Sequence, residues 1–302
     1  MPGVSRARRL RTINGANPPS PAVRGLKGVV LFVACALVLT PFLAVIATSL
    51  ADQAQIAKAG GYVLWPENPT LDAYRAIFRG GVVTRATLVS IGITLVGSGL
   101  SVVVTALLAY SLSRPGSWGH RPILLLVLFT MFFNAGMIPN YLLIKELGLI
   151  DSYWSLILPG LTSAFQIIIV RAFFMEVPKE IIDAARIDGA SELQILTRIM
   201  LPLSKAVIAV VALFNAVSYW SAFFNAVLYI NSTEKWPLQL VLRTYVIDNT
   251  ALGAADLPGE VMPPQQSLQM AILVVSLIPI CLVYPFLQRH FAKGVVIGAV
   301  KG

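Results

Sequence analysis

The side chains that could take part in chemistry gather in one charged stretch, residues 176–202, of an otherwise apolar chain. The stretch includes the acids Glu180, Asp183, Asp188 and Glu192. The sequence contains no His-Glu-x-x-His, Gly-x-Ser-x-Gly or paired histidine and carboxylate, so these acids do not indicate a catalytic site. Anionic lipid would repel them, which argues against a helix lying on the membrane surface. The pattern favours polar contact with another protein.

The first half of this stretch predicts a short helix. Pro178 suits the first turn of a helix, where its missing N–H costs nothing, and residues 179–188 contain good helix formers. Gly189 allows the left-handed turn that ends such a helix. Spacings of three and four residues place these side chains on one face: Ile181, Ala184, Ala185 and Asp188. The alanines keep that face small, so another surface can approach it closely.

A second helix is expected to begin at Ser191. Ser191 and Gln194 have the spacing of a capping box, in which each side chain bonds the other residue's backbone N–H. This helix should run towards Met200 and end at Pro202. The stretch therefore predicts a helix, a tight bend and a second helix, which project from the apolar segments on either side.

The rest of the chain has the composition of a membrane protein. Of its 302 residues, 57% are hydrophobic and 12% are charged, whereas an ordinary soluble domain carries about 25% charged residues. Six runs without charge are each long enough to cross a hydrocarbon layer: residues 28–50, 86–113, 122–144, 152–170, 206–233 and 261–288. Backbone groups in lipid must pair within their own segment, so these runs predict helices. We expect an all-α polytopic membrane protein with six transmembrane helices over residues 28–290.

The two ends of the chain are expected to be tails. Residues 1–27 are rich in Arg, Pro and Ser and predict disorder, and residues 291–302 predict a C-terminal tail. The first apolar run has two interpretations. Its length exceeds that of the apolar core of a secretory signal, which favours a retained helix, whereas the preceding arginines and the small residues Ser49 and Ala51 resemble a cleavable signal.

Basic residues are distributed unevenly between alternate loops. Sixteen of the 23 Lys and Arg residues fall in the N-terminus, residues 114–121, residues 171–205 and the C-terminus. Because basic residues favour the cytoplasmic side, both termini are expected in the cytoplasm, and the loops at 51–85, 139–151 and 234–260 outside. This bias and contact with anionic lipid head groups account for the net charge of +9, so no nucleic-acid partner is expected.

The charged stretch resembles the EAA loop of ABC importer permeases. That loop reads Glu-Ala-Ala, three residues, Gly, nine residues, Ile, one residue, Leu-Pro. The matching positions are Asp183, Ala184, Ala185, Gly189, Ile199, Leu201 and Pro202. Asp183 stands in place of the glutamate and keeps its carboxylate. We call residues 176–202 the EAA-like loop. The segment DAARIDGA and the ending FAKGVVIGAVKG are similar to permeases of the carbohydrate-uptake group, and the resemblance extends over nearly the whole chain from the first span.

The resemblance implies a subunit of the bacterial plasma membrane that carries a carbohydrate inward by alternating access. Its implied partners are a second homologous permease, two ATPase subunits and an extracytoplasmic solute-binding protein. The residues implied in coupling to the ATPase are Glu180, Asp183, Ala184, Ala185, Asp188, Gly189, Ile199, Leu201 and Pro202. A bulky charged group at Ala185 or Gly189 should abolish uptake and leave the protein inserted.

No cofactor or metal is expected in this chain. It lacks the Gly-x-x-x-x-Gly-Lys-Ser/Thr phosphate loop, so ATP and magnesium are expected on the ATPase. Cys35 and Cys281 lie in apolar runs, where a thiol behaves as a small hydrophobe and no disulfide is expected. His120 and His290 stand beside basic residues, without the neighbours that a metal site requires.

Polar and aromatic residues on the fifth apolar run are candidates for the substrate path: Asn215, Tyr219, Trp220 and Asn225. Aromatic faces and amide donors can hold a sugar ring, but hydrogen bonding and packing between helices explain the same residues equally well. On the second run, small residues favour a close-packing face: Gly92, Gly97, Ser98, Gly99 and Ser101.

Other functions fit parts of the pattern. A permease for peptides, amino acids or anions would share the EAA-like loop. An ion-coupled transporter normally places an Asp, Glu or Lys inside a span, and none of the six runs contains one. A polytopic membrane enzyme would be active without an ATPase partner.

Overall fold

The residues that the structure describes form helices joined by loops, with no strand among them, which confirms the predicted all-α class. The computed structural model describes residues 21–79, 81–114, 116, 119–248 and 263–299. Residues 1–20, which are most of the tail predicted over residues 1–27, and the last residues, 300–302, lie outside these ranges. The helices other than those of the EAA-like loop are α1 (Pro21–Leu50), α2 (Gln53–Ala59), α3 (Asp72–Arg79), α4 (Val82–Leu112), α5 (His120–Phe132), α6 (Met137–Glu146), α7 (Trp154–Ile157), η1 (Leu158–Gly160), α8 (Ala164–Met175), α12 (Lys205–Ser221), α13 (Phe224–Tyr229), η3 (Thr233–Lys235), α14 (Leu238–Leu242), η4 (Arg243–Ile247) and α15 (Gln265–Ala299).

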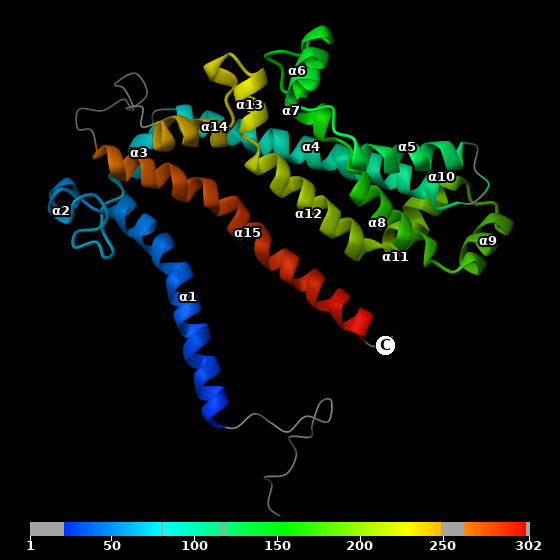
Figure 1. Cartoon of the computed structure of the whole chain (residues 1–302), viewed down its shortest axis with the longest axis horizontal. Coiled ribbons are helices and arrows are strands. Elements are labelled where there is room, and N and C mark those ends of the chain that lie inside the picture. Colours follow the sequence, from blue (N-terminus) through cyan, green and yellow to red (C-terminus); the bar gives the residue numbers. More distant parts are fainter. Residues whose placement is uncertain (1–20, 80, 115, 117–118, 249–262, 300–302) are drawn as a thin grey trace, which may run out of the picture.

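α4 is the central helix of the bundle, and several other helices pack against it, whereas α1 packs against α15 (Figure 1). α12 and α8 pack along the length of α4, and α3 and α14 also contact it. The buried side of α4 carries mostly small side chains, at Ala86, Ser90, Gly97, Ser101, Ala106 and Ala109. Small residues let neighbouring helices approach closely, so the dense contacts of α4 follow from this pattern.

Three helices are long and apolar enough to cross a membrane: α1, α4 and the part of α15 from Gln265 to Val283. They correspond to the predicted runs 28–50, 86–113 and 261–288. Two further apolar segments are bent: α7 with η1 meets α8 at 51°, and the helix ending at Leu203 meets α12 at 87°. Counting each bent pair as one span gives up to five spans among the described residues.

The prediction of one continuous helix over residues 122–144 is wrong. α5 ends at Phe132 and α6 begins at Met137. Between them, Gly136 has a φ of 85° and donates its N–H to Asn134 Oδ1 at 2.9 Å. Such a turn offers the backbone an alternative to the helical hydrogen bonds, so the apolar run is divided.

The runs at 152–170 and 206–233 are also interrupted. The first is divided by residues 161–163, which follow the 3₁₀ turn η1. η1 contains Pro159, which has no N–H to donate to a continuing helix. The second is interrupted after α12, where Ala222 adopts an extended conformation before α13 begins.

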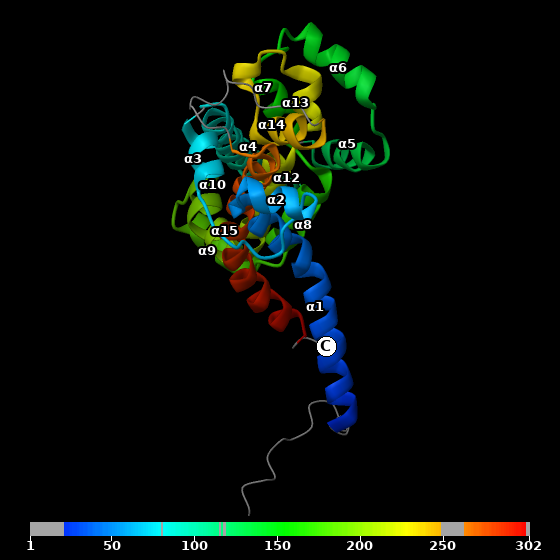
Figure 2. The same cartoon turned by 90° about the vertical axis from the view of Figure 1, so that its left-hand side faces the viewer.

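α1 is fixed to the other helices only near its C-terminal end. Its most apolar 18-residue window has no buried residue, and its first half stands clear of the other helices (Figures 1 and 2). At the attached end, Thr48 accepts a hydrogen bond from the Val63 N–H at 2.9 Å, and Ser267 of α15 donates to the Thr48 and Ala51 carbonyls at 3.2 and 3.1 Å. The expected disordered tail over residues 1–27 is corrected in part, because residues 21–27 already belong to α1.

Asp151 ties the connection between α6 and α7 to the segment before η3. Its Oδ1 accepts the N–H groups of Asn231 and Ser232 at 3.0 and 2.9 Å. Its Oδ2 accepts the Ser232 hydroxyl at 2.7 Å and the Lys235 ammonium at 2.8 Å. The residue has a φ of 60°, a left-handed conformation that Asp tolerates better than most side chains. These hydrogen bonds join two loops that lie far apart in the sequence.

We expect Asp151 to contribute a pH-dependent part of the stability. Hydrogen bonds from Lys235 and then from Ser232 lower the pKa of Asp151 below its ordinary value of 3.8. A lowered pKa in the folded state stabilises the fold fully above about pH 4, and this contribution is lost as the pH falls further. Thermal unfolding of the purified protein should show that Asp151→Asn is less stable than the wild type at pH 7, and that the difference shrinks below about pH 4.

Asp72→Asn is the matched control for this measurement. Asp72 pairs with Arg75 at 3.4 Å, but both side chains are more than 60% exposed. Exposed pairs contribute little, so this variant should unfold like the wild type at every pH. A difference between Asp151→Asn and wild type that stayed constant from pH 7 to pH 2 would contradict the assignment.

Candidate coupling and translocation sites

The EAA-like loop forms the predicted helix, bend and second helix. The first helix, α9 (Lys179–Ile187), begins directly after Pro178. Gly189 has a φ of 82°, and its N–H bonds the Arg186 carbonyl at 3.0 Å, so the bend uses the conformation expected of this glycine. No residue of α9 is buried, which leaves this helix available to another protein.

The second helix begins with the capping box predicted from the sequence. Gln194 donates its N–H to Ser191 Oγ at 3.3 Å, and Ser191 donates its N–H to Gln194 Oε1 at 2.8 Å. The helix comprises α10 (Glu192–Ile195), the π turn η2 (Leu196–Met200) and α11 (Leu201–Leu203).

The prediction that Pro202 ends this helix is wrong by one residue, because Pro202 lies within α11. The π turn precedes it, and the Leu201 N–H bonds the Leu196 carbonyl, five residues back. This wider turn gives the proline ring room that a regular α-helix would deny it. The chain then turns by 87° after Leu203 and enters α12.

The second helix is inserted into the end of the helix bundle. Ile195, Leu196 and Met200 are buried in an apolar cluster with residues of α4, α8 and α12: Ala109, Tyr110, Val170, Phe174, Val207 and Val211. α9 contacts the same cluster only through partly buried side chains, including Ile182 and Ala185. The EAA-like loop is therefore an anchored second helix that carries an exposed first helix.

The predicted coupling residues fall into two environments. Exposed positions are Glu180, Asp183, Ala184, Asp188, Gly189 and Pro202, and half-buried positions are Ala185, Ile199 and Leu201. The shared face predicted for Ala184 and Ala185 is therefore divided, because Ala185 turns towards the bundle and Ala184 towards solvent. Two exposed apolar side chains flank the bend and were not singled out from the sequence: Ile187 is 86% exposed and Leu193 is 64% exposed.

Charged and polar side chains join the EAA-like loop to the end of α4. Glu192 forms an ion pair with Arg114 at 2.7 Å and another with Arg186 of α9 at 3.1 Å. Tyr110 donates to Glu192 Oε2 at 2.6 Å and accepts from Arg114, whose guanidinium lies over the Tyr110 ring at 4.3 Å. We call these four residues the Glu192 cluster.

A cleft of about 360 Å³ opens between α9 and the ends of α4 and α8. Basic side chains from three positions line it together with apolar ones: Arg114, Lys179, Arg186, Phe174, Ile182 and Met200. Its size and its mixed lining can admit a side chain of a bound protein beside the loop.

Tyr219 of α12 holds three parts of the chain together. Its hydroxyl donates to the Ile157 carbonyl at 3.0 Å, so the contact with Ser101 Oγ at 3.1 Å must be donated by the serine. The ring lies against two glycines: a Cβ added to Gly97 would come within 2.9 Å of it, and one added to Gly160 within 3.1 Å of its hydroxyl. Tyr219 is therefore packed within the chain.

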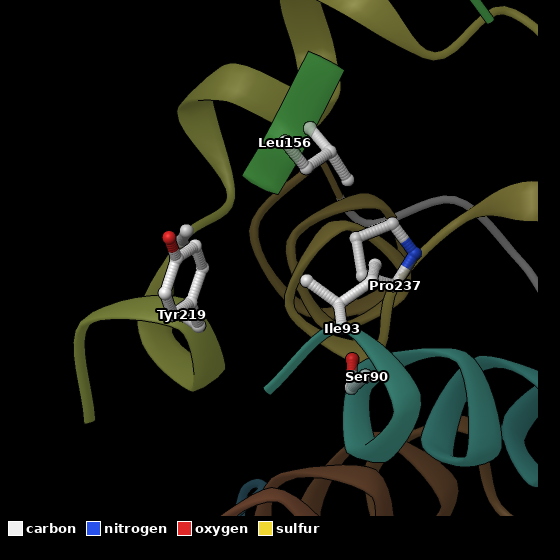
Figure 3. Close-up of a pocket in the computed structure, with 6 residues that line it drawn as sticks. Ser90, Ile93, Leu156, Tyr219 and Pro237 are labelled. Carbon is white, nitrogen blue, oxygen red and sulfur yellow. The ribbon is translucent and has the colours of Figure 1, made fainter. Parts of the chain in front are cut away.

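A small hollow lies beside Tyr219 (Figure 3). Its volume is about 10 Å³, and it is lined by Ser90, Ile93, Leu156, Tyr219, Ala222 and Pro237. This is space for no more than about one water molecule, so a sugar ring does not fit there.

The other candidates on this run differ in exposure. Trp220 is buried, and its indole N–H bonds the Ser276 carbonyl of α15 at 3.0 Å. Asn215 is buried and donates to Gln166 of α8 at 3.0 Å. Asn225 lies beyond the interruption, in α13, and is half-buried. Of the four predicted path residues, Asn215, Tyr219 and Trp220 are bonded to other helices of this chain.

Comparison with known proteins assigns the family. Residues 84–297, which include the whole EAA-like loop, match the family model "Binding-protein-dependent transport system inner membrane component". The chain belongs to this family. The match covers more than half of the sequence. The EAA-like loop, which precedes α12, is thus part of a transport-system permease.

Relatives of this permease include two proteins of Bacillus subtilis (strain 168). The polygalacturonan/rhamnogalacturonan transport system permease protein YtcP is 44% identical over 264 residues, which cover 87% of this chain and 92% of that protein. Protein LplC is 46% identical over 269 residues, which cover 88% of this chain and 90% of that protein.

A solved structure has the same fold. It is the crystal structure of a bacterial ABC transporter involved in the import of the acidic polysaccharide alginate, and the TM-score is 0.83. The two chains are 29% identical, with 91% of this permease and 100% of that chain covered. The fold of this permease is therefore that of an ABC transporter subunit.

Sequence reasoning missed the residues that connect the EAA-like loop to the spans. Tyr110 and Arg114 lie 78 or more positions before Glu192. Nothing in the sequence around them predicts their contact with Glu192. One signal was present. Arg114 follows a long apolar run on the side of the membrane that was predicted to be cytoplasmic, and the EAA-like loop was expected on the same side. A basic residue at that boundary and an acid in the loop can meet only if α4 ends beside the second helix.

Proposed function

We propose that this permease is the membrane-spanning subunit of an ATP-driven importer that moves a carbohydrate across the bacterial plasma membrane. Its family is that of binding-protein-dependent transport systems. One of the relatives named above is a transport system permease protein, and it is named for polygalacturonan and rhamnogalacturonan. The EAA-like loop supports the ATP-driven part of this proposal, and the names of the relatives support the carbohydrate.

One observation carries the proposal: an exposed short helix is carried by a second helix that is anchored in the end of the bundle by three buried side chains. α9 has no buried residue, whereas Ile195, Leu196 and Met200 of the second helix are enclosed by α4, α8 and α12. A force applied to α9 would therefore reach three helices at once. We infer that a separate pair of ATPase subunits, which bind ATP and magnesium, receives α9 and drives these helices.

The topology that we propose has six membrane segments and both termini in the cytoplasm. α1, α4 and α15 would each cross once. The remaining crossings would be made by the bent α7–α8 segment, by α12 with α13, and by α5 with α6. α3 and α14 lie against the beginning of α4, whereas the EAA-like loop lies against the last turn of α4. We assign the loop to the cytoplasm because of its basic flanks.

We infer that the passage for substrate is shared with a second, homologous permease and receives its cargo from an extracytoplasmic binding protein. Asn225 would contribute to the wall directly, because it is half-buried next to the interruption of the fifth run. Asn215, Tyr219 and Trp220 would act behind that wall, where their hydrogen bonds hold α12 against its neighbours.

The test is reconstitution of the permease with its second permease, ATPase and binding protein in proteoliposomes. We expect a carbohydrate to stimulate ATP hydrolysis and to be taken up only with ATP. The panel should compare uronic-acid oligosaccharides with neutral ones and with peptides and amino acids. Stimulation by peptides or amino acids alone would contradict the carbohydrate assignment. Failure of any ATPase to bind would contradict the importer.

A further inference from the structure

We propose that Glu192 links the movement of the EAA-like loop to α4, so that α9 and the last turn of α4 move as one unit. Glu192 would be a positioning residue, since it acts on the spans and not on ATP or substrate. The inference rests on the proposed function, in which an ATPase drives the loop.

One carboxylate joins three elements. Glu192 itself is the first residue of α10. Its Oε2 accepts Tyr110 of α4 at 2.6 Å and pairs with Arg114, which follows α4, at 2.7 Å. Its Oε1 accepts Arg186 of α9 at 3.1 Å. Both helices of the loop and the end of a membrane-spanning helix are thus held at a single side chain.

The other acid near this cluster cannot make the same connection. Asp183 pairs with Arg186 at 3.7 Å, but both residues belong to α9, so this pair adds nothing between elements. Among the ion pairs of the described residues, the one between Glu192 and Arg114 is the pair that crosses from the loop to the end of α4.

Apolar packing alone does not give the loop a direction of movement relative to α4. The buried residues Ile195, Leu196 and Met200 hold the second helix in the bundle, but apolar contact is non-directional. Charge-assisted hydrogen bonds are directional and fix distance and orientation together. Glu192 would therefore convert a displacement of α9 into the same displacement of α4.

Arg114 is suited to this role by its surroundings. Its side chain is only 18% exposed, and it lies over the Tyr110 ring at 4.3 Å. Its pair with Glu192 is less screened by water and salt than a pair of two surface groups. The stacking on Tyr110 also restricts the guanidinium before the carboxylate binds it.

The first experiment measures uptake per ATP hydrolysed in the reconstituted importer. Glu192→Ala should keep binding of the ATPase, because it leaves the exposed face of α9 intact. Carbohydrate transported per ATP should fall about 5-fold or more, in the range of coupling between sites. Glu192→Asp, which keeps the carboxylate, should recover part of the loss. Arg198→Ala removes a charge from an exposed position of the same helix and should transport as the wild type does.

A distance measurement separates movement from stability. Spin labels at Leu193→Cys and Leu107→Cys, both exposed positions, would report the loop against α4 once Cys35 and Cys281 are replaced by serine. In the otherwise native protein the distance distribution should stay narrow with and without ATP. With Glu192→Ala added, it should broaden when the ATPase closes. A loss of stability alone would not produce an ATP-dependent change.

The outcomes distinguish this inference from the proposed function. If Glu192→Ala transports as much per ATP as the wild type and its distances stay narrow, the linkage through Glu192 is wrong and the importer stands. If no ATPase binds the wild-type permease, the proposed function fails first.

If Glu192→Ala does not assemble, Tyr110→Phe replaces it. This variant removes one hydrogen bond to the same carboxylate and should lower uptake per ATP by a smaller factor. An unchanged ratio of uptake to ATP hydrolysed would overturn the linkage.

Discussion

Ala184→Arg is expected to abolish ATP-driven uptake and to leave the permease folded in the membrane. Ala184 is exposed on α9, so a longer side chain there meets no part of its own chain's core. In the proposed complex the same side chain would enter the contact with the ATPase. A residue at the centre of an interface contributes about 2 kcal/mol or more, which corresponds to association weakened by about 30-fold or more.

Co-purification of the ATPase and uptake into proteoliposomes measure the two parts of this expectation. Ala59→Arg is a matched control, because Ala59 is also an exposed alanine on a short helix, α2. It should leave association with the ATPase unchanged. Normal uptake by Ala184→Arg would remove the basis for docking through α9.

Ala184 separates docking from folding better than Ala185 does. Ala185 is half-buried against the apolar cluster that holds the second helix. An arginine at that position would bring a charge to an apolar contact and lower stability as well as docking. Loss of uptake in Ala185→Arg is expected, but it would not show which of the two was lost.

Gly97→Leu is expected to prevent stable folding of the permease. A Cβ at position 97 would lie 2.9 Å from the Tyr219 ring, closer than real contacts allow. The ring cannot move away cheaply, because its hydroxyl is bonded to Ser101 and to the Ile157 carbonyl. Overpacking costs about 1–3 kcal/mol, and displacement of Tyr219 would also break these two hydrogen bonds, which contribute about 1 kcal/mol each.

Thermal unfolding of the detergent-purified protein, together with the amount recovered from membranes, measures this effect. Gly99→Leu is the control on the same helix, since a Cβ at Gly99 meets nothing within 4 Å in this chain. The control should keep the stability of the wild type. Equal stability of the two variants would contradict the packing of Tyr219 against α4.

The local features of the EAA-like loop could be predicted because they depend on neighbours in sequence. The capping box of Ser191 and Gln194 and the left-handed Gly189 both follow rules that act within four residues. The helix lengths were also close to those found. The exception, Pro202, arises because the π turn before it has no simple sequence signal.

Features that depend on distant contacts could not be predicted from one sequence. Helical spacing puts Ala184 and Ala185 on one face, but only the position of α4 and α8 decides which alanine is covered. The same holds for the second run, where Gly97 is buried against Tyr219 whereas Gly92 and Gly99 are exposed. Small residues indicate close packing, but they do not say on which side it occurs.

Hydrophobicity predicted where apolar segments lie and failed to predict their continuity. Residues 122–144 contain no charge, but Asn134 and Gly136 form a turn that divides them. The left-handed conformation of Asp151 could not be predicted from its neighbours in sequence either. It is held by Ser232 and Lys235, which lie more than 80 positions away. In both places a side chain bonded to backbone N–H groups overrides the local preference.

The interruption between α5 and α6 limits what can surround the permease in a bilayer. α5 has 13 residues, so it is about 20 Å long, short of a hydrocarbon layer about 30 Å thick. Peptide groups of an irregular segment at that depth cannot be left against acyl chains. Phe133 and Asn134, exposed in the single chain, must therefore meet protein or water there. A subunit extracted alone would expose this segment to detergent tails, so we expect it to aggregate more readily than the assembled importer does.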